Sequence, residues 1–222
     1  MAVVGLIVGA GFASGQEMMQ YFVAFGRWGI AGAVLAGVVM AAAAAAVLSL
    51  ASYFLAGEHT AVFDRISSPI MSRILDVAVM VTLFSTGFVM FAGAGANLRQ
   101  QFDLPLWVGS LLMVVLVALT GMLDVDKVTR IIGAISPFII VFLVGASIYS
   151  IIRADGTLAE LEPATEGLLT TLPNWWVSAV NYVGFNFMVA VSMAIVIGGT
   201  HLNPREAGVG GLLGGAIFGG LL

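Results

Sequence analysis

The sequence alternates between long apolar blocks and short polar connections. The blocks contain aliphatic, aromatic and small residues over roughly 20 positions, the length that an α-helix needs to cross the hydrocarbon core of a bilayer. Their apolar residues do not alternate with polar ones at every second position, as the strands of a transmembrane barrel would require. The pattern therefore predicts an all-α polytopic membrane protein.

These blocks predict six complete membrane spans and the start of a seventh. The last block is still apolar at Leu222, so we expect the chain to be the N-terminal part of a longer protein, truncated after the start of the seventh helix. The approximate ranges are 2–25, 29–55, 74–96, 106–122, 128–152, 175–198 and 207–222.

The composition excludes several classes of protein. Hydrophobic residues make up 60% of the chain and charged residues only 9%, against about 25% charged in an average soluble domain. The absence of cysteine excludes disulfides and thiolate metal sites, and the scattered Lys and Arg residues predict no surface for nucleic acid. The sequence shows no nucleophile–base pair, phosphate loop or dinucleotide motif, so we expect neither an enzyme nor an organic cofactor.

The basic and aromatic residues predict a cytoplasmic N-terminus. Basic residues in bacterial membrane proteins favour the cytoplasmic side, whereas tryptophan gathers at membrane interfaces. With this orientation the cytoplasmic side would hold Arg65, Arg73, Lys127, Arg130 and Arg205, and the outer side Arg27, Arg99 and Arg153. The outer interface would hold Trp28, Trp107, Trp175 and Trp176.

The middle of the first predicted span is unusually rich in glycine and polar residues. Glycines weaken a helix, and an opened backbone at membrane depth offers carbonyls to Na⁺ and N–H groups to a carboxylate. Close packing of helices in lipid would also explain some of the glycines, but not the adjacent amide and carboxylate. The candidate contacts are Gly9, Ala10, Gly11, Ser14, Gly15, Gln16 and Glu17, with Na⁺ expected at the backbone carbonyls of Gly9 and Ala10.

Glu17 has two interpretations. An intramembrane carboxylate is a candidate proton carrier or cation ligand. The residues from Ser14 to Glu17 also match a capping box, in which Ser14 would cap the second half of the helix and Glu17 would bond back to it. Both interpretations require a helix that restarts near Ser14.

The sixth predicted span contains a second group of candidates, Asn181, Gly184 and Asn186. Asparagines inside hydrocarbon need partners, either in a neighbouring helix or in a solute site. Interrupted spans at matching positions of inverted repeats are typical of transporter binding sites, so we expect discontinuous first and sixth helices. The corresponding organisation is a first five-helix repeat (1–152), an extracytoplasmic loop (153–174) and an incomplete second repeat (175–222).

Three hydroxyl residues of the third predicted span, Thr82, Ser85 and Thr86, are secondary candidates. They share one helix face and could border the same site, although hydroxyl groups often bond back to their own helix.

Asp76 has Arg73 one turn away, which favours an ion pair at the interface. His59 and His201 lie in predicted inner connections without metal-ligand spacing.

The segment IVGAGFASGQE (7–17), followed by a Met- and aromatic-rich half-helix (18–25), resembles the opening of the YkvI-type bacterial membrane proteins. That family is related to the amino acid–polyamine–organocation transporters, so the resemblance implies a LeuT-like inverted-repeat bundle. It also implies solute and ion contacts in segments 9–17 and 181–186. Family members have residues ahead of Met1 and further helices after the seventh span, one of which commonly supplies hydroxyl ligands for Na⁺.

The expected function is secondary active transport of a small polar solute, such as an amino acid or a related zwitterion, in the bacterial cytoplasmic membrane. Na⁺ or H⁺ would be the coupling ion, and spans one, two and six would move against the remainder. The alternative is a solute-sensing receptor subunit on a transporter-like fold without net flux. The surrounding partner would be the lipid bilayer, and the sequence specifies neither the solute nor the oligomeric state.

Overall fold

The computed structural model describes residues 2–8, 15–153, 165, 168, 170 and 172–222, and all regular structure in them is helical. The all-α class is therefore confirmed. The elements are α1 (Ala2–Ile7), α3 (Gln16–Tyr21), the 3₁₀-helix η1 (Val23–Phe25), α4 (Arg27–Phe54), α5 (His59–Ile66), α6 (Pro69–Phe102), α7 (Leu106–Gly121), α8 (Val125–Arg153), α10 (Trp175–Gly199) and α11 (Pro204–Leu221).

Among the described residues, four helices are long and apolar enough to cross a membrane: α4, α6, α8 and α10. They correspond to the second, third, fifth and sixth predicted spans. The fourth span is the shorter apolar helix α7, of 16 residues. The first span is divided between α1 and α3, and the last is the glycine-rich α11.

Helix α6 extends beyond the predicted third span at both ends. The Ser68 side chain caps its start by accepting a hydrogen bond from the Met71 backbone N–H, and Pro69 occupies the first turn, where its missing N–H costs nothing. At the other end Asp103 adopts a left-handed conformation with φ 54° and stops the helix. These end signals fix a helix longer than the apolar stretch alone suggests.

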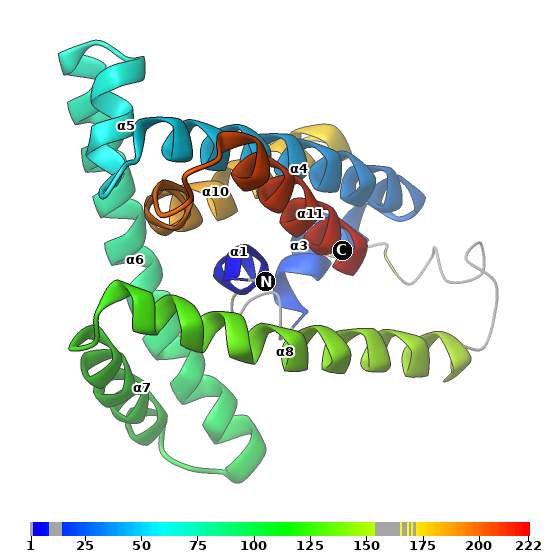
Figure 1. Cartoon of the computed structure of the whole chain (residues 1–222). Coiled ribbons are helices and arrows are strands. Elements are labelled where there is room, and N and C mark those ends of the chain that lie inside the picture. Colours follow the sequence, from blue (N-terminus) through cyan, green and yellow to red (C-terminus); the bar gives the residue numbers. More distant parts are fainter. Residues whose placement is uncertain (1, 9–14, 154–164, 166–167, 169, 171) are drawn as a thin grey trace.

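Helix α4 is the centre of the best-packed part of the molecule. Figure 1 shows α10 and α11 lying against it, with α1 and α3 close by; we call these five helices the packed group. Small residues bring the backbones together, because a Cβ at Gly211 would lie 2.5 Å from the Ala44 carbonyl oxygen and one at Gly37 would lie 2.8 Å from Gly219 Cα. Such close approach is the usual basis of helix association in lipid.

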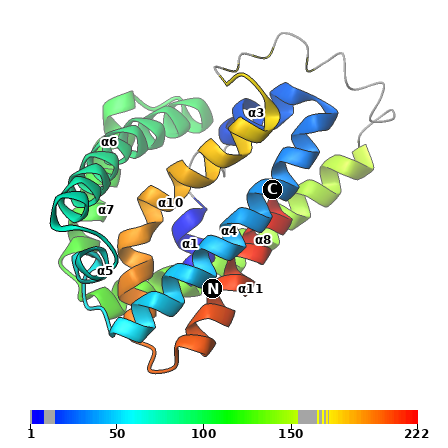
Figure 2. The same cartoon turned by 90° about the horizontal axis from the view of Figure 1, so that it is seen from above.

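Helices α6, α7 and α8, which we call the outer helices, make fewer contacts. Within the most apolar stretch of each helix, 33% of the residues of α4 and 39% of those of α10 are buried. The corresponding shares are 11% for α6 and 6% for α8. Helix α6 passes α10 near α5 and then continues away from it toward α7, as Figures 1 and 2 show. Helices α6 and α7 pack through Gly95 and Gly109, where a Cβ at Gly109 would lie 2.8 Å from Gly95 Cα.

The expected break in the sixth span is wrong. Helix α10 runs without interruption from Trp175 to Gly199, and Asn174 caps its start by accepting from the Val177 N–H at 3.1 Å. A helix tolerates an isolated glycine such as Gly184 at a cost of about 1 kcal/mol. The Asn186 side chain is satisfied within the helix, because its Nδ2 donates to the Tyr182 carbonyl oxygen at 3.0 Å. Neither residue therefore requires an opened backbone.

Candidate functional site

The first span consists of two separate helices in the described residues. Helix α1 ends at Ile7, and α3 begins at Gln16 after Gly15, whose φ of 75° is a left-handed conformation that glycine adopts at little cost. Gly9, Ala10, Gly11 and Ser14, together with the Na⁺ site expected at the first two of them, lie outside the described residues.

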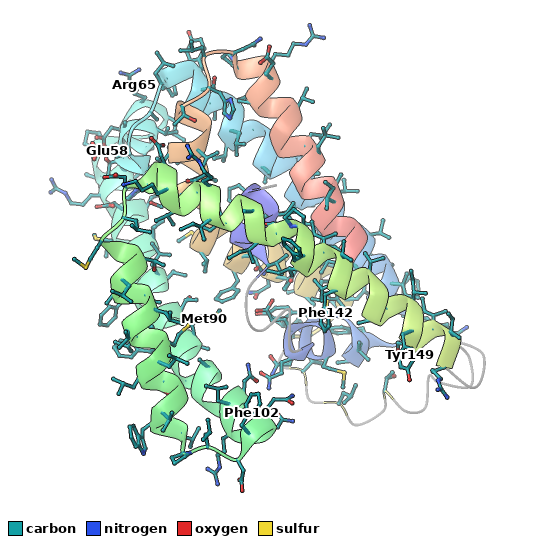
Figure 3. All side chains as sticks on the ribbon, turned by 60° about the horizontal axis from the view of Figure 1, so that its bottom comes forward. Glu58, Arg65, Met90, Phe102, Phe142 and Tyr149 are labelled. Atoms are coloured by element: carbon teal, nitrogen blue, oxygen red, sulfur yellow. The ribbon has the colours of Figure 1, made fainter. Side chains whose placement is uncertain are left out.

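A cavity of about 260 Å³ opens beside the start of α3. It brings together four predicted site residues, Gln16 and Glu17 of α3 with Ser85 and Thr86 of α6. Phe185 of α10 completes one wall. The remaining lining residues, all from α6, are Val89, Met90, Gly93, Ala96 and Asn97. Figure 3 shows Met90 between the α5 end of the molecule, marked by Glu58 and Arg65, and the far end of α6 at Phe102.

The Glu17 carboxylate is the most unusual group at this cavity. Its Oε2 atom and the hydroxyl of Tyr182 are both buried, and neither has a hydrogen-bond partner among the described residues. The two side chains lie within reach of a weak hydrogen bond to each other, and Asn186 likewise lies close to the tyrosine hydroxyl, but neither contact has the geometry of an ordinary hydrogen bond. A buried polar atom without a partner costs about 1–3 kcal/mol, so this pair is a place where a bound solute, ion or water would restore lost hydrogen bonds.

Helices α3 and α10 hold this pair in position. The Ser178 hydroxyl donates to the Tyr21 carbonyl oxygen at 2.6 Å and so fastens one helix to the other. The fully buried Tyr182 ring contacts Tyr21 and Phe22, with centroids 5.1 and 5.0 Å away, and stacks on Phe218 of α11. The Tyr182 ring therefore cannot carry its hydroxyl toward another partner unless these three aromatic rings repack.

Ser14 lies outside the described residues, so the capping-box interpretation of Glu17 stays a prediction. The residue that precedes α3 is Gly15, not Ser14, and it makes no side-chain cap hydrogen bond in the described part of the chain. Glu17 is then the second residue of the helix, where its charge faces the positive end of the helix dipole. Its side chain also lines the cavity.

Among the described residues, the other predicted site residues, Gly15, Thr82, Asn181, Gly184 and Asn186, do not line the cavity. Asn181 and Gly184 are exposed on α10, and the buried Asn186 bonds to its own helix. Thr82 donates its hydroxyl to the Ala78 carbonyl oxygen at 2.8 Å, which is the local bond that the sequence left open as an alternative.

Sequence reasoning missed two features. The first is Tyr182, which lies between two asparagines that drew attention instead; an aromatic hydroxyl at mid-span was the available signal. The second is a contact of His59 with Asp76 and Ser192, at 2.8 and 2.9 Å. The sequence favoured Arg73 as the partner of Asp76, but the carboxylate bonds to the histidine. No group of three or more His, Asp or Glu side chains suited to a metal ion occurs in the part of the chain that the structure describes.

Long apolar helices that pack through small residues define the chain as an α-helical membrane protein. Among curated proteins of Bacillus subtilis (strain 168), it is similar to the uncharacterized protein YyaD, with 26% identity over 99% of this chain, and to the uncharacterized membrane protein YkvI, with 24% identity over 97%. The chain spans 61% and 60% of the lengths of these two relatives. No protein-family model and no solved structure matches the chain.

Proposed function

We propose that the protein is a secondary active transporter of a small polar solute that carries an amine, such as an amino acid or a related zwitterion. The observation that carries this proposal is Glu17, which lines the cavity and has one carboxylate oxygen buried near the fully buried Tyr182 hydroxyl, with no hydrogen-bond partner assigned to either atom among the described residues. A carboxylate and a hydroxyl are acceptors that suit an ammonium group or a small cation.

The cavity supports a small solute. Its volume of about 260 Å³ lies just below the range of roughly 300–1,000 Å³ that is typical of small-molecule sites. Apart from Glu17, the polar lining side chains, Gln16, Ser85, Thr86 and Asn97, are uncharged. They can pair with the polar remainder of a zwitterion, whereas Val89, Met90 and Phe185 exclude a large charged ligand.

The position of the cavity supports transport. It lies between α3 of the packed group and α6 of the outer helices, so a movement of one group against the other would change access to it. Ser178 joins α10 to α3, and Ser52 of α4 donates to the His201 carbonyl oxygen after α10, at 2.6 Å in both cases. These bonds favour movement of α3, α4 and α10 as one body.

A first experiment screens solutes on the full-length purified protein. Thermal stabilisation is measured with the common amino acids, choline and putrescine, each with and without Na⁺ and at two pH values. We expect one solute class to stabilise the wild type, and Glu17→Gln to weaken its binding roughly 10- to 100-fold, because a hydrogen bond to a charged group contributes about 1.5–3 kcal/mol. Glu206→Gln, an exposed glutamate at the start of α11, is the matched control and should bind normally.

A second experiment distinguishes transport from sensing. Proteoliposomes loaded with the unlabelled stabilising solute are placed in a trace of the labelled one. Transient accumulation of label shows transport, whereas binding without counterflow indicates a solute-sensing subunit. Equal binding by wild type and Glu17→Gln would contradict the assignment of the site.

A further inference from the structure

Three polar side chains from three helices meet at the α5 end of the molecule, away from the cavity. His59 of α5 lies between Asp76 of α6 and Ser192 of α10. Its Nε2 is 2.8 Å from Asp76 Oδ1, and its Nδ1 is 2.9 Å from Ser192 Oγ. The histidine and aspartate side chains are 20% and 27% exposed, so water reaches the group only in part. We call these three residues the histidine cluster.

Asp76 is the only charged side chain of the described residues that is bonded to His59. On α5 itself, Asp64 accepts a hydrogen bond from Ser72, Arg65 lies over the Phe54 ring and Glu58 precedes the helix. On α6, Arg73 lines a groove with Ile70, Ile74 and Val77. Helix α10 carries no charged residue. The end of α4 near α5 carries one titratable side chain, that of Tyr53, and no charged one. The charge of the histidine cluster therefore depends chiefly on His59 and Asp76.

The cluster accommodates an added proton without losing a hydrogen bond. With neutral His59, the Nε2–H donates to the Asp76 carboxylate and Nδ1 accepts from the Ser192 hydroxyl. With protonated His59, both ring nitrogens donate and only the serine hydroxyl has to rotate. Proton uptake by the imidazole therefore raises the net charge of the cluster by one.

The cluster lies where the packed group and the outer helices touch. Val79 of α6 forms a buried apolar cluster with Val191 and Ile195 of α10 at this end. Further along α6, residues 85–97 line the cavity, where only Phe185 of α10 takes part. Figure 1 shows the same course, with α6 leaving α10 beyond α5. Separation of α10 from α6 would therefore have to break a bond of His59.

Ser192, His59 and Asp76 also match the residue types of a hydrolytic triad, but their setting does not suit hydrolysis. Ser192 lies within α10, whose backbone N–H groups are engaged in the helix. An oxyanion intermediate would need free N–H donors beside the serine. The geometry favours proton binding over nucleophilic attack.

We propose that the histidine cluster is a proton-binding site and that the proton bound there is the coupling ion of the transporter. The coupling role rests on the proposed function. Separating an imidazolium from a carboxylate costs more than separating a neutral imidazole from it, so proton binding favours the state in which α6 and α10 are joined. By linkage, a solute that binds one of the two states better changes the proton affinity of the cluster.

Histidine NMR on the full-length protein tests the proton site directly. The His59 resonances are identified by their loss in His59→Gln and followed between about pH 5 and pH 8, where histidine ordinarily titrates. We expect the His59 signals to titrate, and the midpoint to move to lower pH in Asp76→Asn, which lacks the charge that stabilises the imidazolium. His201→Gln, the exposed histidine after α10, is the control and should leave this titration unchanged. His59 signals that do not change with pH would overturn the proposal.

Proteoliposome transport tests the coupling role. We expect His59→Gln to keep solute counterflow near the wild-type rate but to lose accumulation driven by an inward proton gradient, while His201→Gln keeps both. Gradient-driven accumulation that survives in His59→Gln would overturn the coupling role. Absence of counterflow in the wild type would instead remove the proposed function and coupling together, and the NMR titration would still decide the proton site.

Discussion

The packed group and the outer helices are built from similarly apolar residues, yet they differ in how their helices meet. Along α4, glycines of α10 and α11 face the backbone of the partner, and a buried apolar core with Met40 and Phe218 surrounds the contacts. Along α6 and α8 most large apolar side chains are exposed, including Phe84, Phe88 and Phe142. Apolar surface alone does not join helices in lipid, because the lipid tails are equally apolar. Close backbone contacts recur along the whole of α4, whereas α6 and α7 approach each other closely around Gly95 and Gly109, and this difference in extent distinguishes the two groups.

This difference also separates structural polar groups from candidate functional ones. Inside the packed group, the hydroxyls of Ser52 and Ser178 are buried and bonded to backbone carbonyls. Glu17 lines the cavity instead and has one buried oxygen without a partner among the described residues, and the histidine cluster spans the border at the other end of the contact. Polar groups that fasten helices are satisfied, whereas those at the border retain capacity for a ligand or a proton.

The largest effect is expected from a bulky residue in the α4–α11 contact. In Gly211→Leu the new side chain would meet the Ala44 backbone, which cannot move without separating the two helices. We expect the free energy of unfolding to fall by about 3 kcal/mol, the upper end of the usual cost of an overpacked contact. Gly210→Leu is the matched control, because the structure describes no atom within 4 Å of a Cβ there. Thermal unfolding of both variants measures the difference, and equal melting temperatures would contradict the assigned contact.

A smaller effect is expected from the same change among the outer helices. In Gly95→Leu the side chain would meet the Leu106 carbonyl and the Ser110 hydroxyl, the latter at 2.6 Å from the new Cβ. Helix α7 has few other contacts and can move away into lipid, so we expect a loss of about 1–2 kcal/mol. Gly87→Leu on the same helix has open space in the described structure and serves as control. A loss as large as that of Gly211→Leu would show that the outer helices are as tightly constrained as the packed group.

A change of opposite sign is expected at Tyr182. Tyr182→Phe keeps the three ring contacts but removes a buried hydroxyl that has no partner in the described residues, so stability should rise by up to about 1 kcal/mol. Solute binding should weaken about 3- to 10-fold, because one hydrogen bond to the ligand is lost. Tyr149→Phe on α8, a residue that is 62% exposed, should change neither quantity. Reduced stability with unchanged binding would show that the hydroxyl is structural.

The sequence predicted the helical class and most of the spans, because long apolar blocks have few other stable structures in a membrane. Four of the polar residues that it singled out, Gln16, Glu17, Ser85 and Thr86, line one cavity, and their binding of a solute stays a prediction. The continuity of α10 was not predictable in this way. Glycine and asparagine permit a break without requiring one, and the local bond of Asn186 removes the need for it.

The partners of His59 were not predictable either. Asp76 and Ser192 lie 17 and 133 positions away, and no local spacing connects them. They meet because α5 is placed between α6 and α10 by the buried residues Val62, Phe63 and Val79. Such a contact depends on the packing of three helices, which hydrophobic periodicity does not specify. The relation of the first and second repeats to a LeuT-like fold stays a prediction.

The smallest effect is expected from Ser110→Ala, which tests whether the outer helices rely on polar contacts more than on close packing. The Ser110 hydroxyl of α7 donates to the Phe91 carbonyl oxygen of α6 at 2.9 Å. Hydrogen bonds between membrane helices contribute about 0.6 kcal/mol on average, so the melting temperature should fall only slightly. Thr120→Ala on the same helix is the control, because its hydroxyl bonds to the Leu116 carbonyl of its own helix and joins no neighbours. If Ser110→Ala destabilised the protein as much as Gly95→Leu, the α6–α7 contact would depend on its hydrogen bond, and the outer helices would be held together by a different interaction from the packed group.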